Sequence, residues 1–172
     1  MRERKKILFL TERFPWMGKH SGYDMVCAAV MKAEPSNEYT DVLRMPGNTY
    51  TKIINIFSRN LFISLGLSPF YHFDSAVAEL QALKRCFQSR HDLIHVLYAE
   101  TDLCILPYLR RRFGYKVVGT AHQPDIWWHV IQRTPKSISM LDALITVSSK
   151  QAAFFEQYMP GRVFFIPHGI DT

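Results

Sequence analysis

The sequence predicts an α/β fold: a Rossmann-like, doubly wound parallel sheet covered by helices in three α/β/α layers. Short continuous apolar runs alternate with longer amphipathic segments along the chain. Continuous runs, unlike alternating ones, are typical of strands that are buried on both faces of a parallel sheet. The chain has 172 residues, enough for one compact core, so we interpret residues 1–172 as a single domain.

Six apolar runs of strand length are interpreted as the strands of this sheet. They are Lys5–Glu12, the weaker run Thr40–Met45, Asp92–Glu100, Lys116–His122, Asp142–Ser149 and Arg162–His168. Helical segments lie between most of them: Tyr23–Lys32, Ser75–Ser89, Thr101–Phe113 and Ser149–Tyr158. This strand–helix alternation is the pattern of βαβ units.

Local signals set the expected helix faces and ends. In Ser75–Ser89 the apolar positions 76, 77, 80, 83, 86 and 87 predict one buried stripe. Thr101 is the predicted N-cap of the next helix, and Gly114 ends it. Ser148 and Gln151 have the spacing of a capping box, and Pro160-Gly161 ends the last helix.

The segment Thr51–Leu67, which follows the turn at residues 45–48, has two interpretations. Its apolar residues and its cations Lys52 and Arg59 fit a helix that packs on the sheet. They also fit an interfacial helix that touches a membrane or a hydrophobic acceptor.

Composition restricts the partners. The net charge of +6 and the pI of about 9.3 favour anionic ligands or an acidic lipid surface. Nucleic acid is not expected, because aromatic residues do not interleave with the basic clusters 1–6 and 110–112.

No apolar run could span a bilayer and no signal peptide is visible, so we expect a cytoplasmic protein, with peripheral contact at the inner membrane face left open. The cysteines Cys27, Cys86 and Cys104 are interpreted as reduced core thiols.

Ligands of an open parallel sheet bind beyond the carboxyl ends of the strands, at the point where the strand order reverses. The first loop contains only Gly18 and Gly22, so neither the GxGxxG fingerprint nor the P-loop spacing is present. Ser21 and Gly22 precede the helix that begins at Tyr23. Free backbone amides at a helix start can hold a phosphate or a sugar hydroxyl, and glycine permits close approach.

His122 ends the fourth strand and is the candidate catalytic residue. A histidine at this edge could hold a sugar hydroxyl or a phosphate oxygen. Gln123, Asp125 and Glu100 belong to the same group of loops and are further candidate binding residues. A hydrolytic triad of Ser148, His122 and Asp125 is disfavoured, because no GxSxG elbow surrounds Ser148.

The chain resembles the N-terminal domain of glycosyltransferase family 4, retaining enzymes of the GT-B fold. The resemblance is carried by "KILFLTERFPWMGKHSGYD", "HDLIHVLYAE", "VVGTAHQPD" and "LDALITVSSKQAAFFEQYMPGRVFFIPHGIDT". In that family an aspartate opens the strand that ends in serine, and a turn "IPNGID" leads into an interdomain linker. Asp142, Ser148 and "IPHGID" fill these places, with His168 where asparagine is usual.

The resemblance implies a hexosyltransferase whose N-terminal domain binds the acceptor and whose C-terminal domain binds a nucleotide-sugar. It implies a glycan or lipid-linked acceptor, no metal and no cofactor, since the nucleotide-sugar is a co-substrate. Gly22 matches the family glycine near the donor diphosphate, whereas Ser21 departs from a glycine pair. His122 matches a histidine near the transferred sugar. The C-terminal domain would be absent from this chain, which alone would then transfer no sugar.

Two other classes of function stay open on the sequence alone. One is a non-catalytic binding module for a phosphorylated glycan or a lipid surface. The other is a stand-alone nucleotide-binding Rossmann protein, which the missing glycine fingerprint weakens.

Overall fold

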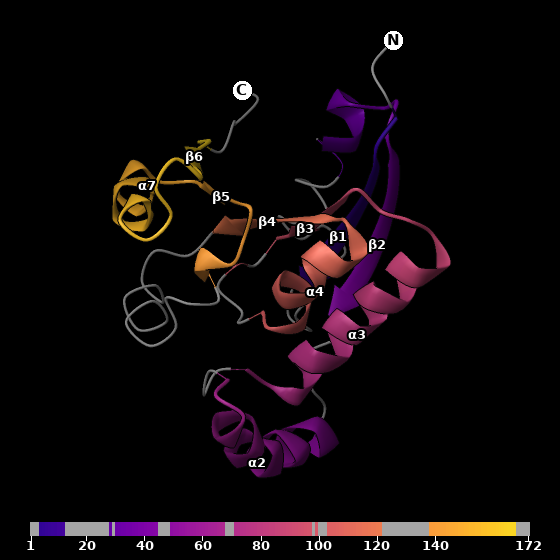
Figure 1. Ribbon diagram of the computed structural model, residues 1–172, viewed down its shortest axis with the longest axis vertical. Helices are drawn as coiled ribbons and strands as arrows, with labels where there is room; N and C mark the ends of the chain where they lie inside the picture. Colours follow the sequence, from indigo (N-terminus) through magenta and orange to yellow (C-terminus); the bar gives the residue numbers. More distant parts are fainter. Residues whose placement is uncertain are drawn as a thin grey trace.

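The computed structural model describes residues 4–12, 28, 30–44, 49–67, 71–97, 99, 103–121 and 138–167. Within them, six strands form one parallel sheet in the order β2-β1-β3-β4-β5-β6 (Figure 1). The strands are β1 (Lys6–Glu12), β2 (Glu38–Arg44), β3 (Leu93–Val96), β4 (Lys116–Ala121), β5 (Ala143–Thr146) and β6 (Val163–Phe165). The helices are α2 (Thr49–Ser64), α3 (Phe73–Gln88), α4 (Ile105–Phe113) and α7 (Ser149–Glu156). Residues 30–33 are also helical.

The order of the strands confirms the predicted doubly wound sheet. From β1 the chain first adds β2 on one side, and then β3 and the later strands on the other. The strand order therefore reverses at β1, and the crevice expected for a ligand lies between the carboxyl ends of β1 and β3.

Both faces of the sheet are covered, as the continuous apolar runs predict. Leu8 and Phe9 are neighbours in β1 and point to opposite faces, yet each is 0% exposed. Leu8 belongs to the larger core, which α3, α4 and α7 cover. Phe9 belongs to a smaller core with Val30 and stacks on Tyr39 at a centroid distance of 5.7 Å. The three-layer α/β/α arrangement follows.

The buried face of α3 differs from the predicted stripe. Its buried residues are Ser75, Ala78, Glu79, Ala82 and Leu83. Of the predicted positions, Leu80 is 56% and Phe87 is 69% exposed. Leu83 is buried as predicted. The small residues at 78 and 82, which the predicted stripe did not include, face the sheet because they let the helix axis come close to it.

The helix α2 does not pack on the sheet, so the first interpretation of this segment was wrong. It lies against α3, below the sheet in the view of Figure 1. The strand β6 is also less buried than expected. It is an edge strand, and Phe164 and Phe165 are 50% and 49% exposed.

Two predicted caps differ from the structure and one is confirmed. The helix α4 begins at Ile105 with Cys104 as N-cap, not at Thr101, which lies outside the described residues. Gly114 ends it in the left-handed conformation, with φ of 73°, as expected. Ser148 is the N-cap of α7, but its hydroxyl makes no capping hydrogen bond, so the predicted capping box is absent.

Candidate carbohydrate site

The carboxyl edge of the sheet is held together by backbone hydrogen bonds that continue past the strand ends. The amide of Leu97 donates to the carbonyl of Leu10 at 3.0 Å, which joins the segment after β3 to β1. The amide of Ala99 donates to the carbonyl of Thr120, also at 3.0 Å. The loops after β1, β3 and β4 therefore start from points that are fixed against one another.

A buried polar pair lies directly below this edge. His95 Nε2 and Thr120 Oγ1 are 2.7 Å apart and link β3 to β4. The imidazole also packs against Phe9, with ring centroids 5.6 Å apart. His95 and Thr120 are both buried and their polar atoms are bonded to each other, so this pair supports the edge.

The predicted site residues themselves lie outside the described residues: Gly18, Ser21, Gly22, Tyr23, Glu100, His122, Gln123 and Asp125. Their positions in the chain are nevertheless informative. Glu100 follows Ala99, and His122 follows Ala121, the last residue of β4. Since Ala99 is bonded to Thr120, the described residues bring the starting points of these two loops together.

Sequence reasoning assigned Gln151 only to a helix cap. It is 7% exposed, and neither its Oε1 nor its Nε2 has a hydrogen-bond partner among the described residues. Gln151 lies one turn before Phe155, which is 0% exposed, so the two share the helix face that looks toward the sheet. Side chains on a helix lean toward its N-terminus, and α7 starts just after β5. The amide therefore lies at the carboxyl edge.

A buried amide that has no partner among the described residues is the signal that would have identified Gln151, and it follows only from the packing of the folded chain. Leaving such a group unpaired costs roughly 1–3 kcal/mol. Its one donor group and one acceptor group could pair with a ligand group that both donates and accepts, such as a hydroxyl.

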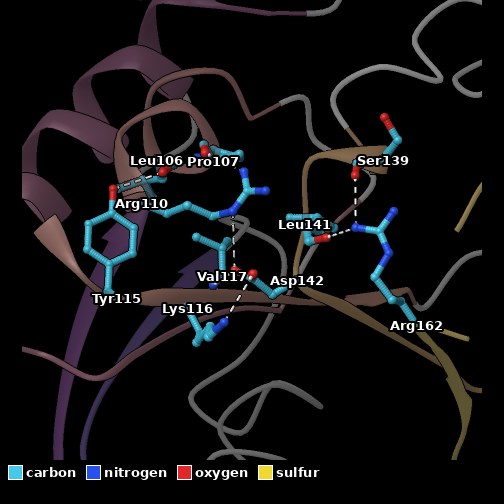
Figure 2. Close-up of polar contacts among 10 residues, drawn as sticks. All are labelled: Leu106, Pro107, Arg110, Tyr115, Lys116, Val117, Ser139, Leu141, Asp142 and Arg162. Carbon is cyan, nitrogen blue, oxygen red and sulfur yellow. Dashed lines mark hydrogen bonds and ion pairs between the residues drawn. The ribbon is translucent and has the colours of Figure 1, made fainter. Parts of the chain in front are cut away.

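The aspartate that opens β5 has a structural role at the opposite edge (Figure 2). Asp142 Oδ2 accepts a hydrogen bond from the amide of Val117 at 2.9 Å and lies 3.5 Å from Arg110 Nε. Lys116 Nζ lies 3.7 Å from Asp142 Oδ1. Just before β6, Arg162 donates to the carbonyl of Leu141 at 2.7 Å. These contacts hold the amino ends of β4, β5 and β6 in register.

A pocket of about 340 Å³ opens beside Asp142. It is lined by Arg110, Arg111, Gly114, Tyr115, Lys116 and Asp142. Two of its three cations already face the carboxylate of Asp142, and the pocket lies at the amino edge, away from the expected ligand loops. It is therefore not the candidate site.

The described ranges contain neither a cluster of metal ligands nor a helix that could span a membrane. There, no three histidine, cysteine, aspartate or glutamate side chains gather as ligands for a metal ion. The helices of the same ranges are all too short or too polar to cross a bilayer. Burial raises the pKa of the Cys86 thiol to about 11, so this cysteine is protonated at neutral pH, as expected for a core thiol.

Comparison with known proteins supports the resemblance noted in the sequence. The sequence pattern of the family described as Glycosyltransferase Family 4 matches residues 24–172. The match includes Glu100, His122, Gln123 and Asp125, and it begins after Gly22 and Tyr23. No individual curated protein matched the chain. Because the match covers most of the sequence and the parallel sheet agrees with it, this chain belongs to glycosyltransferase family 4.

Proposed function

We propose that this domain forms the acceptor side of a retaining hexosyltransferase of the GT-B type, which moves a sugar from a nucleotide-sugar to a glycan or lipid-linked acceptor. The observation that carries the proposal is the carboxyl edge of a family 4 domain. There the loops of the candidate residues start from adjacent, hydrogen-bonded strand ends.

In this proposal His122 donates a hydrogen bond to the transferred sugar, and the amide of Gly22 approaches the donor diphosphate. A retaining transfer needs stabilisation of the departing phosphate charge and oriented hydroxyls, which such groups can supply. The amide of Gln151, which has no partner among the described residues, would bind a hydroxyl of the acceptor. No metal is required in this scheme.

The donor is proposed to bind a second domain, because the resemblance to the N-terminal domain of GT-B enzymes implies a separate C-terminal domain for the nucleotide-sugar. The 172-residue chain alone is therefore expected to transfer no sugar. The test is to assay it beside the product of the complete reading frame, with a panel of nucleotide-sugars. Turnover by the 172 residues alone would contradict the two-domain proposal. A complete frame without a second α/β domain would favour the non-catalytic binding module instead.

The role of His122 is tested in the complete protein. The change His122→Ala should lower kcat by about 100- to 1,000-fold, the usual cost of removing one donor that stabilises a transition state. Tyr108→Phe is the control, since Tyr108 is 75% exposed on α4 and should leave kcat unchanged. If His122→Ala and the wild type had equal kcat, His122 would not be a catalytic residue.

A further inference from the structure

The cations in the last turn of α4 have no role in the proposed transfer reaction. This turn contains Arg110, Arg111 and Arg112, and the first two line the pocket of about 340 Å³ at the amino edge of the sheet. Lys116, the first residue of β4, also lines it. Among the described residues that form the lining, Asp142 is the only carboxylate, so two positive charges are in excess there.

Two guanidinium groups at this pocket have no partner in the part of the chain that the structure describes. The side chain of Arg111 makes neither an ion pair nor a hydrogen bond with the described residues. A Cβ at Gly114, which lines the pocket, would lie 4.0 Å from Nη2 of Arg90, and Arg90 is likewise unpaired among these residues. Each guanidinium has five N–H donors, so both can bind an anion from solvent.

The helix dipole accounts for part of this charge but not for all of it. Cations at the carboxyl end of a helix offset the negative end of its dipole, which explains the arginines inside α4. Lys116 and Arg90 lie outside α4, so the dipole does not explain their place beside the pocket. The arrangement is therefore more than a helix end with favourable charges.

The carboxylate of Asp142 lies between the side chains of Arg110 and Lys116 (Figure 2). Its Oδ2 accepts the amide of Val117 and faces Arg110, whereas its Oδ1 has only Lys116 near it among the described residues, at 3.7 Å. A carboxylate oxygen can accept two hydrogen bonds, so Oδ1 has capacity for a further donor. An anion that carries an O–H group could supply this donor, whereas an anion without a proton would be repelled.

These groups together indicate the chemistry of the ligand. Hydrogen phosphate has charged oxygens for the guanidinium groups and an O–H group for Asp142. A phosphorylated sugar has the same two functions, because a sugar hydroxyl takes the place of the P–O–H group. Sulfate has no proton at neutral pH and lacks the second function. The volume of the pocket suits a small ligand, and no aliphatic side chain is among its described lining residues.

We propose that the pocket at the amino edge is a second ligand site, which binds a phosphate group that carries or adjoins a hydroxyl. Arg111, Arg110 and Lys116 bind the phosphate oxygens in this site. Asp142 Oδ1 accepts a hydrogen bond from the hydroxyl. The site lies at the start of β4, and the candidate carbohydrate site lies beyond its other end, so the two ligands would not compete. This inference goes beyond the transfer reaction and does not depend on it.

Isothermal titration calorimetry of the 172-residue protein tests the site, with inorganic phosphate, glucose 1-phosphate and sulfate at neutral pH and constant ionic strength. At least one of the two phosphates should bind roughly tenfold more tightly than sulfate, because sulfate cannot donate to Asp142. Tighter binding of glucose 1-phosphate would assign the hydroxyl to a sugar, and tighter binding of inorganic phosphate would assign it to the ion itself.

Arg111→Gln should weaken the binding of the preferred phosphate by roughly tenfold or more, because a charged hydrogen-bond donor is lost. Arg59→Gln is the matched control, since it also removes an exposed arginine, from α2, and it should bind the phosphate as the wild type does. Arg111 is exposed, so Arg111→Gln should keep the thermal unfolding midpoint of the wild type.

Asp142→Asn distinguishes a specific site from a diffuse patch of positive charge. The asparagine oxygen can still accept the amide of Val117, while its NH₂ group can donate to an anion that has no proton. The preference for phosphate over sulfate should therefore fall by roughly tenfold. In a diffuse patch the lost negative charge would favour both anions equally, and the preference would not change.

The results that would overturn the proposal are equally definite. Wild-type protein that binds neither phosphate, or that binds sulfate as tightly as both of them, would contradict a phosphate site. Equal weakening in Arg111→Gln and Arg59→Gln would show that only the total charge of the protein matters. An unchanged preference in Asp142→Asn would mean that this carboxylate does not select the ligand, and the proposed site would fail with it.

Discussion

Asp92 and Lys6 are joined by two hydrogen bonds at the amino edge of the sheet. The amide of Lys6 donates to Asp92 Oδ2 at 2.9 Å, and the amide of Asp92 donates to the carbonyl of Lys6 at 2.9 Å. Asp142 and Val117 repeat the arrangement at 2.9 and 2.8 Å. In both pairs an aspartate just before one strand accepts the amide directly opposite it on the neighbouring strand. Two aspartate side chains therefore fix the amino edge of the sheet.

The aspartate that opens β5 is consequently expected to matter for stability. Asp142→Ala should lower the free energy of unfolding by roughly 1–3 kcal/mol, because the amide of Val117 loses its acceptor. Asp142→Asn should cost less than half as much, since its oxygen still accepts that bond. Urea unfolding followed by circular dichroism measures both. Equal losses in the two variants would assign the effect to the charges of Arg110 and Lys116 instead.

Gly119 in β4 is the second test of the core. A Cβ at this position would lie 2.6 Å from the Cβ of Ala99 and 2.9 Å from Leu141 Cδ1. Gly119→Ala should therefore destabilise the domain by roughly 1–3 kcal/mol, as over-packing does. Adding Ala99→Gly removes the shorter contact, so the double variant should recover part of the loss in the thermal unfolding midpoint. Additive losses in the double variant would contradict this explanation.

The strands could be predicted from the sequence because their signal is local. Leu8 and Phe9 are both buried, so the run around them had to be continuously apolar whatever lay on either face. The start of α4 could not be predicted in this way. The carboxylate that accepts its first amides belongs to Glu79, on another helix 25 residues before Cys104.

For the candidate site, too, one part could be predicted from the sequence and another part could not. Continuous apolar runs indicate parallel strands, and ligands of an open parallel sheet bind at the carboxyl ends of the strands. The edge that holds the candidate site could therefore be predicted from the sequence. Gln151 is buried without a partner in the part of the chain that the structure describes, and this depends on how α7 packs on the sheet. Its spacing from Ser148 suggested a local cap instead. Tertiary packing decided between the two uses of the same residue.

Glu79 predicts how stability depends on pH. It is 0% exposed and accepts hydrogen bonds from the amides of Cys104 and Leu106 and from the hydroxyl of Tyr71. Burial raises the pKa of this carboxyl above its usual value, and the donors offset only part of the rise. The folded state therefore keeps the proton at pH values where the unfolded chain has released it. The contribution of Glu79 to stability is full below pH 4.5 and declines as the pH rises above that value.

The measurement is the free energy of unfolding of the wild type minus that of Glu79→Gln, at steps from pH 4 to pH 8. Glu79→Gln should be less stable by roughly 1–3 kcal/mol, because its amide group must face a backbone donor in place of an oxygen. The difference should shrink as the pH rises. In the Tyr71→Phe variant the carboxylate of Glu79 loses one hydrogen-bond donor. The free energy of unfolding of this variant should therefore fall more steeply with rising pH than that of the wild type. A difference that is constant with pH would contradict the raised pKa.

The last prediction distinguishes a binding residue from a packing residue at Gln151. Gln151→Leu replaces the unpaired amide with an apolar group of similar size, so it should raise the free energy of unfolding by about 1 kcal/mol or more. In the complete enzyme the same change should raise the KM for the acceptor, because the hydroxyl partner is lost, and leave the KM for the donor unchanged. Gln157→Leu, at an exposed position of the same helical segment, is the control and should change neither quantity. Reduced stability in Gln151→Leu would mean that the amide is hydrogen-bonded within the folded chain. Gln151 would then no longer be a candidate binding residue.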